Sequence, residues 1–195
     1  MVEETRDRIM EATYRALCEH GYASLTMQDI ADECDCSKSL LHYHFDTKED
    51  LLVALLAHLI EKFDERVSPS DEDPREQLVD LVEIFCFGDG RARADHRAFH
   101  TALLELRAQA PHNDAFRAQL AENDAQVHAT VTAVIERGIE SGAFREVDAR
   151  RTAAHILAAI QGARIRWVTL GDDDSIEAVH DALVDDLIDG WLVVE

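Results

Sequence analysis

Residues 26–45 read TMQDIADECDCSKSLLHYHF, and this stretch decides how the N-terminal part of the chain folds. Thr26 is followed three residues later by Asp29, which resembles a capping box with aspartate in place of glutamate and predicts the start of a short helix. Residues 34–36 are too few for a loop and predict a tight turn. Ser37 has the side chain of a helix N-cap, so a second short helix is expected directly after the turn. Two short helices joined by three residues have the spacing of a helix-turn-helix unit.

The second of these helices, expected over residues 37–44, has one apolar and one polar side. Leu40 and Leu41 can face a core. The polar side chains are Ser37, Lys38, Ser39, His42 and His44. A helix that enters the major groove of DNA has to be short and exposed on one side, and hydroxyl groups near a helix N-terminus suit phosphate oxygens. The pattern fits DNA recognition and an ordinary amphipathic helix after a turn equally well, so both interpretations stay open.

Apolar residues recur at helical spacing along nearly the whole chain, and 3 proline and 8 glycine residues give little turn chemistry for an all-β fold. The sequence predicts an all-α protein of about nine helices. They are expected over residues 5–20, 26–33, 37–44, 47–63, 74–86, 95–109, 113–140, 148–170 and 174–194. The segment SPSDEDP at residues 68–74 is the clearest break between helices. The acidic runs 71–73 and 172–174 are expected to be solvated linkers.

Length and composition place the chain among globular proteins. It has 195 residues, of which 47% are hydrophobic and 30% are charged, enough to build a core. No apolar run is long enough for a membrane span, and the first residues, MVEETRDRIM, are charged and amphipathic rather than a signal peptide. We therefore expect a cytoplasmic protein without a membrane partner. Its four cysteines are too few and too scattered for a disulfide scaffold.

The chain is strongly acidic, with 40 acidic residues against 19 basic ones and a formal net charge of −21. Only Lys38, Lys48 and Lys62 are lysines, and the other sixteen basic residues are arginines. This bias predicts a protein that stays soluble in concentrated salt, as in a halophile. Residues 1–67 hold 7 basic and 15 acidic residues, so this segment lacks the net positive charge that is typical of a DNA-binding domain. At molar salt the Debye length falls to about 3 Å, which screens the repulsion between such a chain and DNA.

The stretch from Gly21 to Leu51 strongly resembles the DNA-binding signature of the tetracycline-repressor (TetR) family. The matching residues are Gly21, Thr26, Ile30, Ala31, Cys36, Ser37, Lys38, Leu41, Tyr43, His44, Phe45, Lys48 and Leu51. The resemblance implies DNA contacts by Thr26, Ser37, Lys38, Ser39, Tyr43, His44 and Lys48. His42 departs from the family pattern, in which an aromatic residue is common, and is added to the expected contacts as a polar residue of the same helix. Two of the three lysines fall on these positions. The turn departs from the family pattern because Asp35 stands in place of glycine, although aspartate tolerates the left-handed conformation.

The resemblance also implies two domains with different functions. Residues 1–46 would form a DNA-binding domain of three helices, and residues 47–195 a helical domain for effector binding and dimerisation. The implied protein is a ligand-responsive transcriptional repressor. It would bind a near-palindromic operator on double-stranded DNA as a homodimer and be released by a small-molecule effector. No cofactor is predicted, and an enzyme is not expected because the chain lacks a nucleophile–base constellation, an H-E-x-x-H motif and a glycine-rich phosphate loop.

Two further sets of candidate residues, for effector binding and for dimerisation, follow the linker in the sequence. The effector pocket is expected between the helices of residues 74–140 and the helix of residues 150–170. Its candidate lining residues, each of which could equally belong to a plain core, are Phe85, Phe87, Phe99, Leu103, Phe116, Val127 and Trp167. The candidate dimer interface combines a stripe of small residues with one side of the last helix, namely Ala154, Ala158, Gly162, Ile176, Leu183, Leu187 and Trp191. Internal packing is the alternative for this set.

Cys34 and Cys36 stand in the turn, with His42 and His44 close by in the sequence. Two thiols and two imidazoles could in principle hold a metal ion. The two thiols alone could sense redox state, which would make a DNA-binding protein that needs no small-molecule ligand. A recognition helix, however, has to expose its histidines to DNA, and no C-x2-C spacing is present. The favoured interpretation is two small hydrophobic side chains that pack the turn, with no metal.

Overall fold

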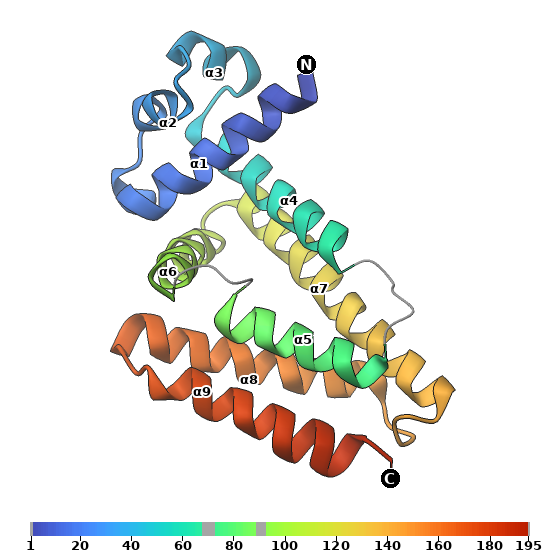
Figure 1. The fold of residues 1–195 in the computed structure, drawn as a ribbon. Helices are drawn as coiled ribbons and strands as arrows, with labels where there is room; N and C mark the ends of the chain where they lie inside the picture. Colours follow the sequence, from blue (N-terminus) through green and yellow to red (C-terminus); the bar gives the residue numbers. More distant parts are fainter. Residues whose placement is uncertain (1, 68–72, 89–92, 195) are drawn as a thin grey trace. The chain divides into compact units, whose positions relative to one another are not determined.

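The structure, a computed structural model, describes residues 2–67, 73–88 and 93–194. Within these ranges the chain forms nine α-helices, a π-helical segment and an isolated antiparallel bridge, so the all-α prediction is confirmed (Figure 1). The elements are α1 (Val2–Ser24), α2 (Met27–Cys34), α3 (Lys38–His44), α4 (Lys48–Arg66), α5 (Pro74–Phe87), α6 (Arg93–Gln109), α7 (Asp114–Ser141), α8 (Ala149–Leu170), α9 (Asp174–Asp181) and the π-helical η1 (Ala182–Leu192). The last helix predicted from the sequence therefore changes form part-way along. No helix among the described residues is long and apolar enough to cross a membrane.

α5 begins where the sequence predicts the end of the linker. The side chain of Asp73 accepts hydrogen bonds from the backbone N–H groups of Arg75 and Glu76, at 2.8 and 3.3 Å, and Pro74 stands in the first turn. Most of the predicted linker, and with it most of the acidic run 71–73, lies outside the described residues. At the other end of the helix, Gly88 adopts a positive φ of 84° as the C-cap.

The chain forms two compact units. Unit 1 consists of Met1–Arg66 and Ala98–Asn123, and unit 2 of Val67–Arg97 and Asp124–Glu195. Two helices, α6 and α7, contribute residues to both units. The boundary after residue 46 that the family resemblance implies is a division by function, and it stays a prediction.

The core of unit 1 is built from the apolar faces of its helices. Ile9 and Met10 of α1, Ile30 of α2, Leu41 of α3 and Leu52 of α4 are each at most 1% exposed. Burying a large apolar side chain stabilises a fold by about 1.5–3 kcal/mol. α1 packs against both α2 and α4, and α2 packs against α3. Helices as short as α2 and α3 are unstable alone in water, so this packing is what holds the helix-turn-helix unit in shape.

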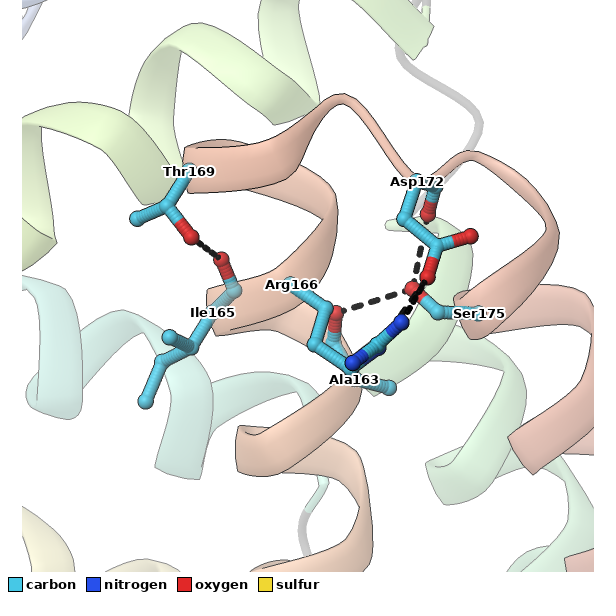
Figure 2. Close-up of polar contacts among 6 residues, drawn as sticks. All are labelled: Ala163, Ile165, Arg166, Thr169, Asp172 and Ser175. Carbon is cyan, nitrogen blue, oxygen red and sulfur yellow. Dashed lines mark hydrogen bonds and ion pairs between the residues drawn. The ribbon is translucent and has the colours of Figure 1, made fainter.

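In unit 2, α8 lies beside α9 and also contacts α5 (Figure 1). Polar contacts tie the turn between α8 and α9 (Figure 2). Arg166 donates to the carboxylate of Asp172 at 2.6 Å, and the hydroxyl of Ser175 lies 2.7 Å from the carbonyl oxygen of Asp172 and 3.1 Å from that of Ala163. The end of α8 and the start of α9 are thereby joined through one short turn.

The acidic run 172–174 lies at the connection between α8 and α9, and Asp173 and Asp174 are exposed, as expected of a linker, but two of its three carboxylates also take part in this network. Asp172 is paired with Arg166, as described above. Asp173 accepts a hydrogen bond at 2.8 Å from the indole N–H of Trp167, a side chain that is only 2% exposed. The buried indole needs an acceptor for its N–H, and the turn brings this carboxylate within reach. A run of three acidic residues carries no sign of that requirement.

The end of the chain is held on the turn that follows α7. Phe144, which is 3% exposed, forms an antiparallel bridge with Val193. The backbone N–H of Phe144 donates to the carbonyl oxygen of Gly138 at 2.9 Å, and that of Arg145 donates to Leu192, also at 2.9 Å. Side chain and backbone of Phe144 are therefore both fixed by their neighbours.

Candidate nucleic-acid interface

The start of α2 carries the capping box predicted from the sequence. Asp29 N–H donates to Thr26 Oγ1 at 3.3 Å, and Thr26 N–H donates to Asp29 Oδ2 at 2.8 Å. The Thr26 hydroxyl also donates to this carboxylate, and the two bonds from Thr26 lower the pKa of Asp29 below its usual value. An anion thus already occupies the donors at the start of α2, and a phosphate contact by Thr26 stays a prediction.

The turn between α2 and α3 depends on Asp35, which adopts the left-handed conformation with φ 51° and ψ 45°. It is the one non-glycine residue with positive φ among the described residues, as its place in the turn predicts. The Cys36 N–H donates to the carbonyl oxygen of Ala31 at 3.0 Å and closes α2. From α1, the Arg8 guanidinium donates to the carbonyl oxygen of Cys34 at 3.3 Å. Sequence reasoning missed this contact because it spans 26 residues.

α3 shows the division into a buried and an exposed side that the sequence predicts. Ser37 caps the helix by accepting the N–H of Leu40 at 3.2 Å, and Leu41 is fully buried. The side chains left exposed are Ser37, Lys38, Ser39, His42, Tyr43 and His44. Tyr43 is 82% exposed, which is unusual for a large aromatic residue. Six of the eight proposed contacts therefore lie on one solvent-facing surface.

Lys48, the last of the proposed contacts, is engaged inside unit 1. Its ammonium group donates to the carbonyl oxygens of Tyr22 at 2.9 Å and Leu25 at 3.1 Å, and lies 4.5 Å from the centre of the Tyr22 ring. These contacts join the first residue of α4 to the end of α1 and to the residue that follows it. A phosphate contact by Lys48 stays a prediction, and the structure adds a role in holding the unit together.

The two cysteines of the turn are poor candidates for redox chemistry. Cys34 is 8% exposed and Cys36 is half-buried. Burial, together with the hydrogen bond and charge of neighbouring Cys34, raises the pKa of Cys36 to about 12. The thiolate is the reactive form of cysteine, and it is scarce at neutral pH in such a site. Within the described residues, no group of three His, Cys, Asp or Glu side chains lies close enough to hold a metal ion. The burial of Cys34 and Cys36 therefore favours their role as side chains that pack the turn over a redox or metal-binding role.

The candidate effector-binding residues fall on both units. In unit 1, Phe99 and Leu103 of α6 line an apolar cavity of about 10 Å3 with side chains of α1 and α4. That volume is room for about one water molecule. Phe116 belongs to the same unit and is fully buried. The members in unit 2 are Phe85, Phe87, Val127 and Trp167, of which Phe87 is the most exposed at 38%. The effector pocket stays a prediction.

The candidate dimer residues differ in exposure within unit 2. Ala154, Ala158 and Gly162 of α8 are exposed, and Trp191 is 42% exposed. Leu187 is half-buried, whereas Ile176 and Leu183 are 2% and 7% exposed. A side chain already buried in the single chain adds little apolar area on association. The dimer hypothesis therefore rests on the exposed members of the set.

A left-handed turn, a short capped helix and an exposed polar face define a helix-turn-helix protein of the kind that binds DNA. Two sequence models of known families match the chain. Residues 9–55 match "Bacterial regulatory proteins, tetR family", and residues 74–192 match "BetI-type transcriptional repressor, C-terminal". The chain belongs to the TetR family of transcriptional regulators, which confirms the family resemblance. Its relatives are regulators of transcription and not enzymes.

Several characterised proteins resemble the whole chain. The HTH-type transcriptional regulator TtgR of Pseudomonas putida is 29% identical, over 92% of this chain and 86% of its own. The crystal structure of a TetR transcription regulator from Haloarcula marismortui, a halophile, has 38% identity and a TM-score of 0.85, over 97% of this chain and 99% of its own. A transcriptional regulator from Saccharomonospora viridis, solved in complex with choline, has 28% identity and a TM-score of 0.80, over 99% and 100%.

Proposed function

We propose that this protein is a homodimeric repressor that binds a near-palindromic operator and is released when a small molecule binds its C-terminal helices. The observation that carries the DNA-binding part is the exposed polar face of α3, presented on a capped helix with a buried Leu41 behind it. Lys38 supplies a positive charge at the first turn of that helix, where the helix dipole also favours phosphate. Tyr43 and His44 supply further hydrogen-bonding groups at its end.

Lys38→Ala is expected to weaken operator binding by about 1–3 kcal/mol, because it removes the cation at the start of the recognition helix. Lys62→Ala is the matched control. It removes the same charge from α4, where Lys62 pairs with Glu65 at 2.9 Å. Footprinting on the DNA upstream of the protein's own gene, followed by titration of the protected fragment, measures both variants. Equal loss in the two variants, or protection without a discrete palindrome, would contradict the proposal.

The dimer is proposed to form through the exposed face of α8. Ala154, Ala158 and Gly162 follow one another at intervals of one turn, and an added Cβ at Gly162 would meet no atom within 4 Å in the single chain. Small residues at this spacing allow close approach of a second helix. Ile165, on the same helix, is 51% exposed and supplies apolar area. A twofold axis through this face would present two α3 helices to the two halves of a palindrome.

Gly162→Arg is expected to convert the dimer to a monomer, since a long charged side chain would stand in the face proposed to be buried. Ala118→Arg, at an exposed position on α7, makes the same change of size and charge elsewhere and should leave the dimer intact. Sedimentation velocity in molar KCl distinguishes the two outcomes. A wild-type protein that sediments only as a monomer would contradict the dimer.

The effector is proposed to be a small organic cation, and choline is the first compound to use. The relative from Saccharomonospora viridis, solved in complex with choline, supports this choice. Aromatic rings of unit 2 already accept cations: the Arg97 and Arg164 guanidinium groups lie 5.9 and 5.7 Å from the ring centres of Trp167 and Phe85. The footprinting experiment described above, repeated with millimolar choline, should show loss of protection. Unchanged protection would rule out choline as the effector.

A further inference from the structure

We propose that Glu105 of α6 is a positioning residue for DNA binding, which acts by holding the backbone of Tyr22 just ahead of the helix-turn-helix unit. The proposal rests on the proposed function, since it concerns how the operator-binding helices are kept in place. All of the residues that carry it belong to unit 1.

The contact lies at a break inside α1. Gly21 has φ 69° and ψ 163°, which is not helical, and the chain then makes a new helical turn that begins with the bond from Leu25 N–H to Gly21 O at 3.1 Å. Tyr22 is the first residue of this turn, so its N–H has no acceptor within the helix. The Glu105 carboxylate accepts it at 2.5 Å. The positive φ at position 21 favours glycine, and a Cβ there would also lie 3.0 Å from Glu105 Oε2, so the carboxylate would have to shift by a few tenths of an ångström.

Tyr22 is held at its other atoms by two more helices. Its carbonyl oxygen accepts from Lys48 of α4 at 2.9 Å, and its ring lies under the same ammonium group. Its hydroxyl lies 3.4 Å from Glu49 Oε1, also on α4. The edge of its ring contacts Phe116 of α7, with 6.1 Å between the ring centres. One residue thus joins α1 to α4, α6 and α7.

Only four residues separate Tyr22 from Met27, the first residue of α2, and Leu25 between them is 2% exposed. A displacement of the Tyr22 backbone would therefore also displace the start of α2, because the connection between them is short and is anchored by the buried Leu25. The apolar packing around Leu103 contains the cavity described above. The hydrogen bond between Glu105 and the Tyr22 amide therefore adds a directional contact between α6 and α1 beside this apolar packing.

The experiment compares Glu105→Ala with Glu105→Gln in the full-length protein in molar KCl. Glutamine keeps an acceptor oxygen for the Tyr22 N–H, whereas alanine removes it. Glu19→Ala, at an exposed position on α1, controls for the loss of one negative charge. Two quantities are measured for each variant: operator affinity, corrected for the folded fraction, and the rate of hydrogen exchange at the Tyr22 amide.

Glu105→Ala is expected to weaken operator binding by about 10-fold and to speed exchange at the Tyr22 amide. Glu105→Gln and Glu19→Ala are expected to stay close to the wild type in both measurements. A purely structural role would lower the melting temperature of Glu105→Ala and leave the affinity of the folded protein unchanged, which would overturn the proposal. Unchanged exchange at Tyr22 would overturn it as well. If the wild-type protein protects no discrete operator, the proposed function fails first, and this inference falls with it.

Discussion

Gly138→Ala is expected to destabilise the protein by about 3 kcal/mol or more, because position 138 has no room for a methyl group. A Cβ there would overlap the ring of Phe144 and lie 2.6 Å from its Cγ. Rotation about the Cα–Cβ bond would move Cγ, but the side chain is only 3% exposed and is enclosed by its neighbours, so another rotamer would collide with them. The main chain of Phe144 is held by its bond to the Gly138 carbonyl and by the bridge to Val193. Relief of the overlap would have to displace the end of the chain.

Urea unfolding in molar KCl, followed by circular dichroism, measures this loss. Phe144→Leu provides the control, since a smaller side chain at 144 removes part of the obstacle. The cost of Gly138→Ala should be clearly smaller in the Phe144→Leu background than in the wild type, because the two positions are in contact. An equal loss of stability in both backgrounds, or a Gly138→Ala variant as stable as the wild type, would contradict the prediction, because it would show that the structure around position 138 can accommodate the methyl group.

Raising KCl from 0.1 M to 2 M is expected to stabilise the fold strongly. The chain carries 40 acidic and 19 basic residues, so a compact state concentrates like charges. The Debye length falls from about 10 Å to below about 3 Å over this range, which removes repulsion between neighbouring exposed carboxylates. A gain of about 3 kcal/mol would raise the melting temperature by roughly 6–12 °C for a chain of this size. Melting curves at several KCl concentrations test the halophile hypothesis directly.

Charge variants separate screening from a general effect of the salt. Glu11→Gln, Glu19→Gln and Glu136→Gln remove three exposed negative charges without changing side-chain size much. The combined variant should be more stable than the wild type at 0.1 M KCl and should gain less from added salt. The same gain in both proteins would point to a different cause, and stability that fell with added KCl would contradict the hypothesis. Operator binding should weaken as salt rises, since counterion release contributes less.

Sequence reasoning succeeded where a residue's partners are close along the chain. Thr26 and Asp29 form the capping box, Asp35 takes the left-handed turn conformation and Ser37 caps α3, as their order in the sequence predicts. The buried Leu41 follows from helical periodicity. The family signature lies in this same segment, and the matches to known families confirm it.

Sequence reasoning missed contacts whose partners are distant along the chain. The ammonium group of Lys48 bonds to carbonyl oxygens 26 and 23 residues away, while the phosphate contact that the resemblance implies for it stays a prediction. Asp173 looks like part of an acidic linker, yet it accepts the hydrogen bond of a buried indole. A charged side chain takes the partners that the packed helices bring to it, and neither periodicity nor composition records that outcome.

The amino-acid sequence alone determines the helical class of this protein, the geometry of its turn and the face of α3 that meets solvent. Each of these depends on propensities and hydrogen bonds within about four residues. The tertiary structure alone decides how that unit is held. The Tyr22 amide meets Glu105 across 83 residues of chain, and Phe144, which packs against Gly138, also forms a bridge with the distant Val193. Such contacts form after distant helices have packed, because burial of apolar faces sets which polar groups become neighbours.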